Sequence, residues 1–72
     1  MTLATTIEIV VNGEARCAAA GGTLLELLQT LGLDPRAVVV EHNRRIVRRP
    51  ELGLVTLAAG DSIEVVHFVG GG

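Results

Sequence analysis

The sequence lacks several residue types that small proteins use for stability or chemistry. It contains no lysine, tryptophan or tyrosine, and only one phenylalanine and one cysteine among 72 residues. A single cysteine cannot close an internal disulfide, which excludes a disulfide-stabilised scaffold. No apolar stretch is longer than the one at residues 37–40, far short of the roughly 18–20 residues that cross a bilayer. The first residues show no signal-peptide pattern, so we expect a cytoplasmic protein without a membrane partner.

The length limits what this chain can do alone. A mass of 7.5 kDa allows one domain with a small core, and a hydrophobic fraction of 49% argues against a disordered chain. An enzyme needs a pocket of roughly 300–1,000 Å³ walled by side chains. Little material is left here for such a pocket, so we expect a carrier or binding module and not an enzyme.

Two strands joined by a tight turn are predicted at the start. Residues 6–11 alternate in polarity, and Asn12-Gly13 tolerates the positive φ angles of a type I′ hairpin turn. The second strand then covers residues 14–19. Its inward side chains are expected to be those of Ala15, Cys17 and Ala19. Cys17 is accordingly interpreted as a small buried residue and not as a nucleophile.

One helix is predicted over residues 23–31. Thr23 and Glu26 have the spacing of a capping box, in which each side chain accepts a hydrogen bond from the other residue's backbone. An apolar stripe at helical spacing follows, formed by Leu24, Leu27, Leu28 and Leu31. Gly32 is placed to take the left-handed conformation that ends a helix.

The remaining segments complete a small sheet. Strands are predicted at residues 37–42, 45–47 and 62–69, with turns at 43–44, 50–53 and 59–61. A lone helix must cover one face of a sheet. The order of elements predicts an α+β fold of β-grasp type, a mixed sheet of four to five strands with one main helix on one face. Residues 1–69 would form this domain, with the first and last strands side by side at its centre.

Residues 70–72 are expected to form a flexible glycine tail. Gly70, Gly71 and Gly72 contribute no side-chain packing, and glycine loses the most conformational freedom when it is ordered. Because it has no side chains, such a segment can enter a narrow channel. Three extended residues reach about 10 Å. The alternative is a frayed terminus without a function.

An apolar patch is predicted beside this tail. Along the last strand, Ile63, Val65 and His67 should face the helix, while Glu64, Val66 and Phe68 should face away. Val39 and Glu41 of the neighbouring strand should point the same way as Phe68. An exposed patch of Val39, Val66 and Phe68 would suit a partner protein. The alternative is that a symmetric dimer or the arginine-rich segment covers it.

Charged residues give weaker signals. Four of the six basic residues are clustered, namely Arg44, Arg45, Arg48 and Arg49. The cluster can be a solvated loop or a docking patch for an acidic protein surface. Nucleic-acid binding ranks below both, because no aromatic residues flank the cluster and the net charge is −2. His42 and His67 lack the spacing of a metal site, so we expect no metal.

Several of these segments together resemble the ThiS family of thiamine-biosynthesis sulfur carriers. The resemblance covers nearly the whole chain and includes the Asn12-Gly13 turn, the Thr23-Leu24-Leu25-Glu26-Leu27-Leu28 helix, Gly60-Asp61 and the ending Val66-His67-Phe68-Val69-Gly70-Gly71-Gly72. A terminal Gly-Gly alone would also fit the small subunit of molybdopterin synthase, other sulfur carriers and ubiquitin-like modifiers. The residues before it favour ThiS.

The resemblance implies a chemistry centred on Gly72. A ThiF-like adenylyltransferase would use Mg·ATP to adenylate its carboxylate, and a persulfide from a cysteine desulfurase relay would then displace AMP. The resulting thiocarboxylate would donate sulfur to a ThiG-like thiazole synthase. The chain itself would bind no cofactor, because ATP and Mg belong to the partner enzyme.

Three other functions remain open. The chain could carry sulfur for molybdopterin or cysteine synthesis. It could be a ubiquitin-like modifier, although the missing lysines exclude lysine-linked chains of itself. It could also be an interaction module whose glycines are incidental.

Overall fold

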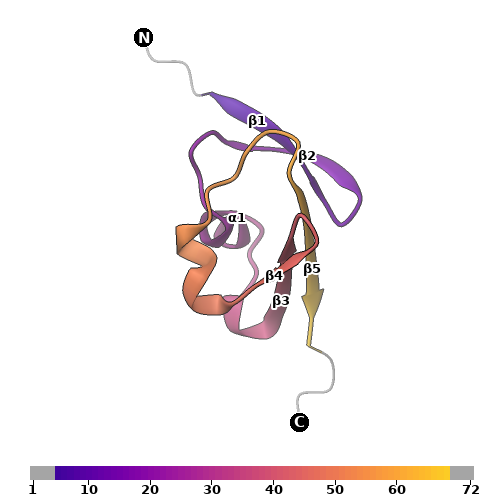
Figure 1. Ribbon diagram of the computed structural model, residues 1–72, viewed down its shortest axis with the longest axis vertical. Coiled ribbons are helices and arrows are strands. Elements are labelled where there is room, and N and C mark those ends of the chain that lie inside the picture. Colours follow the sequence, from indigo (N-terminus) through magenta and orange to yellow (C-terminus); the bar gives the residue numbers. More distant parts are fainter. Residues whose placement is uncertain (1–4, 69–72) are drawn as a thin grey trace.

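Five strands, one α-helix and two 3₁₀ helices form the regular structure of residues 5–68, which the computed structural model describes (Figure 1). In chain order they are β1 (Thr6–Val11), β2 (Glu14–Ala19), α1 (Leu24–Thr30), η1 (Pro35–Ala37), β3 (Val38–His42), β4 (Arg45–Val47), η2 (Arg49–Leu54) and β5 (Ser62–His67). All predicted strands and the predicted helix are present, with small shifts at their ends.

The first and last strands lie side by side in the middle of the sheet. The strand order is β2-β1-β5-β3-β4, with β1 and β5 parallel and all other neighbours antiparallel. This confirms the predicted β-grasp arrangement. Figure 1 shows α1 beside η2, the orange coil, so both elements cover the same side of the sheet.

Local signals in the sequence set the ends of α1. The hydroxyl of Thr23 accepts a hydrogen bond from the Glu26 N–H at 3.2 Å, and the Glu26 carboxylate accepts one from the Thr23 N–H at 2.9 Å. This is the predicted capping box. Gly32 follows the helix with a φ of 74°, a conformation that glycine adopts without steric cost.

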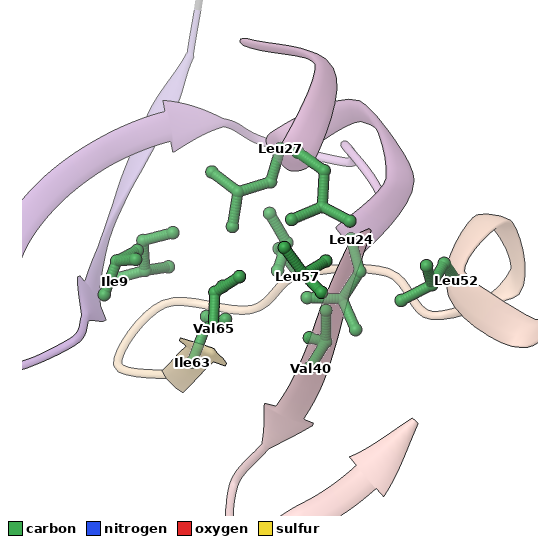
Figure 2. Packing of buried hydrophobic residues seen from close by; sticks show 11 residues of the cluster. Ile9, Leu24, Leu27, Val40, Leu52, Leu57, Ile63 and Val65 are labelled. Atoms are coloured by element: carbon green, nitrogen blue, oxygen red, sulfur yellow. The ribbon is translucent and has the colours of Figure 1, made fainter. Parts of the chain in front are cut away.

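The core lies between α1 and one face of the sheet. Figure 2 shows Leu24 and Leu27 of the helix meeting Val40 and Ile63 of the strands, with Leu52 of η2 closing one side. β5 alternates between buried and exposed side chains, as a strand with one covered face should. The opposite face of the sheet, here called the open face, carries no helix within residues 5–68.

The predicted faces of β2 are wrong. Because the turn has only two residues, Val11 pairs with Glu14 and Ile9 with Arg16, and directly paired residues share a face. The core side of β2 therefore carries Glu14, Arg16 and Ala18. The residues expected inside, Ala15, Cys17 and Ala19, are exposed. Cys17 is thus a free, exposed thiol and not a buried one.

Two asparagine side chains hold β5 in place. β1 and β5 pair directly only at Val10–Ser62 and Val11–Ile63. The side-chain amide of Asn12 then accepts from the Val65 N–H at 2.8 Å and donates to the Val65 carbonyl at 3.2 Å, which prolongs this connection beyond the end of β1. On the other side of β5, the Asn43 side chain accepts from the Ser62 N–H at 2.9 Å.

Asp61 ties the start of β5 to the β3–β4 turn. Its carboxylate accepts hydrogen bonds from His42 Nε2 at 2.7 Å, Asn43 Nδ2 at 3.1 Å and the Ala58 N–H at 2.8 Å. An ionised carboxylate can only accept, so His42 carries a proton on Nε2. Burial alone raises the pKa of Asp61, but the hydrogen bonds from His42, Ala58 and Asn43 outweigh it and leave the pKa below its ordinary value.

Replacing Asn12 tests the connection to β5. Asn12→Gly keeps the positive φ of this position, 50°, and removes both hydrogen bonds to Val65. We expect the free energy of unfolding to fall by about 1–3 kcal/mol in urea titrations, because Val65 loses both side-chain partners. A variant as stable as the wild type would show that the amide does not hold the strand.

The Asp61 cluster predicts a stability that depends on pH. Because the folded-state pKa is lowered, the contribution of the charge is complete above the unfolded pKa of about 4 and is lost as the pH falls through the folded value. Asp61→Asn should therefore lower stability by about 1–3 kcal/mol near pH 7, and the deficit should shrink in acid. Urea titrations across this range test it, with Glu8→Gln as the exposed-carboxylate control. A deficit independent of pH would contradict the prediction.

Candidate functional site

The candidate site begins where β5 ends. The Phe68 N–H donates to the Ala37 carbonyl at 2.9 Å, which fixes the last described residue beside the start of β3. Gly70, Gly71 and Gly72 lie outside the described residues, so their roles stay predictions. Phe68 therefore directly follows the central strand of the sheet.

The open face carries apolar side chains next to this point. Val66 is 59% exposed and Phe68 is 63% exposed, which confirms that both face away from the core. Val39 is half-buried and pairs directly with Val66, so the two side chains are cross-strand neighbours on one face. We call Val39, Val66 and Phe68 the docking patch. Val66 and Phe68 are open to solvent within residues 5–68, and whether a partner binds the patch stays a prediction.

Ile46 is 69% exposed and was not predicted to be part of this surface. Ile46 pairs with Glu41 and therefore lies on the open face. The two-residue turn at Asn43-Arg44 could have revealed this, because it fixes His42 opposite Arg45 and so Glu41 opposite Ile46. The apolar surface near the end of β5 is thus larger than predicted.

Arginines surround part of this surface. A cleft of about 230 Å³ is lined by Val39, Ile46 and Phe68 on its apolar side. Arg36, Arg48 and Arg49 line the same cleft, here called the arginine cleft. Arg45 instead lines a different cleft together with His42 and Glu51. The structure therefore places Arg45 on one cleft and Arg48 and Arg49 on another, and both clefts border Ile46 and Val47.

Arg36 has a local partner in Asp34. Its Nε lies 3.3 Å from Asp34 Oδ1, and both side chains are exposed. The pKa of Asp34 is lowered first by the hydrogen bond from the Arg36 backbone N–H and then by the Arg36 side chain, with a smaller contribution from the charge of Arg49. The positive charges near the arginine cleft are thus close enough to act on an acidic group.

A pair of carboxylates lies on the open face beyond Val66. Glu41 and Glu64 are directly opposite each other in the antiparallel β3–β5 pair. Like charges in this arrangement destabilise a sheet. Along β5, the open face therefore carries first Glu64, then Val66, and then Phe68 beside the arginine cleft.

The described residues contain no candidate metal centre. Residues 5–68 contain no group of three or more histidine, cysteine or acidic side chains arranged to hold a metal ion. His42 is engaged with Asp61, and His67 is exposed. Within the same residues, no helix is long and apolar enough to span a membrane.

Comparison with known proteins gives a consistent result. A model of the ThiS family matches residues 9–72. The sulfur carrier protein ThiS of Bacillus subtilis is 43% identical over 51 residues, which cover 71% of this chain and 77% of that protein.

Two thiazole synthases are also similar to the chain. The protein of Magnetococcus marinus is 50% identical and that of Paramagnetospirillum magneticum 42% identical, each over 66 residues and 92% of this chain. The chain covers only 20% of the length of each synthase.

Solved structures share the fold. The crystal structure of the thiamine biosynthesis protein ThiS from Geobacter metallireducens has a TM-score of 0.79 and 30% identity, covering 92% of this chain and 100% of that one. An NMR structure of a thiamine biosynthesis protein from the same organism has a TM-score of 0.76 and 30% identity, covering 92% of this chain and 88% of that one.

Proposed function

The chain belongs to the ThiS family, and on this basis we propose that it is a sulfur carrier for thiazole formation in thiamine biosynthesis. The carboxylate of Gly72 would be adenylated and then converted to a thiocarboxylate. The observation that carries the proposal is the family match over residues 9–72, which includes the glycine tail. The similarity to a named sulfur carrier over 77% of that protein's length supports it.

A thiazole synthase is the proposed acceptor of the sulfur. Two thiazole synthases contain a segment 50% and 42% identical to this chain, and that segment makes up 20% of each. Joining the two activities in one polypeptide raises their effective concentration, which is useful when one must deliver its product to the other. The same pairing would occur here between this chain and a synthase.

The proposed chemistry explains why the chain needs few functional groups. An α-carboxyl titrates near 3.3–3.7, so at neutral pH Gly72 would be a carboxylate and a poor acyl donor. A partner adenylyltransferase would form the acyl-adenylate from Mg·ATP, releasing pyrophosphate. A persulfide would displace AMP, and a thiol would then cleave the S–S bond to leave the thiocarboxylate. All catalytic groups belong to the partners.

The role of the domain would be presentation. β5 lies in the centre of the sheet, and the side-chain oxygens of Asn12 and Asn43 fix it by accepting hydrogen bonds from the Val65 and Ser62 N–H groups. The four residues after Phe68 span at most about 14 Å when extended. A partner would therefore have to contact the domain close to Phe68 in order to reach Gly72.

Intact-mass measurement tests the proposed chemistry. After incubation with ATP, the adenylyltransferase and a persulfide donor, the chain should gain the mass difference between sulfur and oxygen. Deletion of Gly72 should abolish this gain. The new terminal carboxylate, on Gly71, would lie one residue short of the reacting atoms in the partner's active site. An unchanged mass for the wild type, with adenylyltransferase active on another carrier, would refute the proposal.

Replacing Phe68 tests the docking patch. Phe68→Ser should lower kcat/KM for adenylation at least about tenfold, or about 1.4 kcal/mol, because an aromatic anchor is lost. Stability should change by less than about 0.5 kcal/mol, since the side chain is 63% exposed. Leu54→Ser is the matched control, because Leu54 is 80% exposed but belongs to η2 on the helix side. Equal rates for Phe68→Ser and Leu54→Ser would remove the patch from the function.

A further inference from the structure

The arginine cleft combines an apolar floor with an unusual concentration of positive charge. The chain has a net charge of −2, yet five of its six arginines lie within residues 36–49. Three of these, Arg36, Arg48 and Arg49, line the cleft together with Phe68 and Ile46. Within residues 5–68, neither Arg48 nor Arg49 forms an ion pair. Two guanidinium groups are therefore available beside exposed apolar side chains.

The opposite end of the open face has the reverse charge. Glu41 and Glu64 face each other across β3 and β5 without a basic side chain paired to either of them within residues 5–68. Phe68 lies four positions after Glu64, a distance of about 13 Å along a strand. Like charges held opposite each other cost stability, and a basic group on a partner would relieve that cost. The open face thus has a direction, from acidic to basic, that runs along β5.

From this arrangement we propose that the arginine cleft binds an acidic segment of the partner protein that receives the tail. An apolar side chain of that segment enters between Val39, Ile46 and Phe68, and its flanking carboxylates pair with Arg48 and Arg49. A basic group on the same partner faces Glu41 and Glu64. The proposal rests on the proposed carrier function, because it assigns the partner surface that surrounds the entrance for the tail.

Arginine suits this role for a physical reason. Its planar guanidinium binds a carboxylate through two parallel hydrogen bonds, which fixes the orientation of the two groups. Opposite charges at two ends of one surface also disfavour binding in the reversed orientation, where like charges would meet. The cleft lies at Phe68, within about 14 Å of extended chain from Gly72. Correct docking would therefore direct the tail toward the partner's active site.

Charge reversal in the full chain tests the proposal. The probe is the adenylyltransferase of the same organism, without ATP, and binding is measured by titration calorimetry at two salt concentrations. Arg48→Glu and Arg49→Glu should each weaken binding at least about tenfold, and the loss should shrink at high salt. Arg45→Glu is the matched control, because it makes the same charge change in the same segment but lies on the cleft with His42 and Glu51. We expect it to bind within about twofold of the wild type.

Three results would overturn the inference. Wild-type affinity for Arg48→Glu and Arg49→Glu, or an equal loss for Arg45→Glu, would show that the arginine cleft is not used. Tighter binding of a single-stranded RNA oligomer than of the enzyme, lost in Arg48→Glu, would identify a nucleic-acid site instead. The mass assay keeps the two proposals apart: if the arginine variants bind with wild-type affinity and gain sulfur normally, the carrier function is retained while the cleft proposal fails. If the chain binds the enzyme through Arg48 but never gains sulfur, the arginine cleft is a binding site and the proposed carrier function fails.

Discussion

The position of β5 depends on hydrogen bonds from side chains as well as on strand pairing. β1 contributes only two direct residue pairs to it, and the Asn12 amide supplies the next donor and acceptor in the same line. Asparagine fits this place because its amide carries both a donor and an acceptor, as a peptide group does, and because it tolerates positive φ better than most residues. Asn12 thus forms part of the β1–β2 turn and also holds β5, the strand that precedes the glycine tail, by hydrogen bonds. Asn43 holds the start of β5 in a similar way, because its side chain accepts a hydrogen bond from the Ser62 N–H and donates one to the Asp61 carboxylate.

The exposed docking patch follows from the size of the fold. One seven-residue helix and a short 3₁₀ helix can cover one face of a five-stranded sheet, but not both. Strand alternation then places every second residue of β5 in the open. In a small monomer, exposed strand positions would normally carry polar side chains. Val66 and Phe68 are exposed but apolar, so they depart from this pattern. This exposed apolar surface is the reason for proposing a docking site on the open face.

The sequence allowed most of the fold to be predicted, because its strongest signals are local. The capping box at Thr23, the Asn12-Gly13 turn and the leucine stripe act within a few residues, and the structure has all three. The faces of β2 were mispredicted because small apolar residues occur on both sides of that strand. Turn length, and not hydrophobicity, decides which side faces the core. The side-chain bonds of Asn12 to Val65 join residues far apart in sequence, and nothing local indicates them.

The division of charge on the open face bears on how a tail of glycines can be specific. Three glycines offer a partner no side chains to read, so any discrimination between carriers has to come from residues near the base of the tail. Apolar contacts at Phe68 and Ile46 can supply affinity, but they are poor at fixing orientation because hydrophobic burial is not directional. Guanidinium groups at one end and carboxylates at the other supply that direction. Under the proposed function, the folded domain would supply partner recognition and Gly72 would supply the reacting carboxylate.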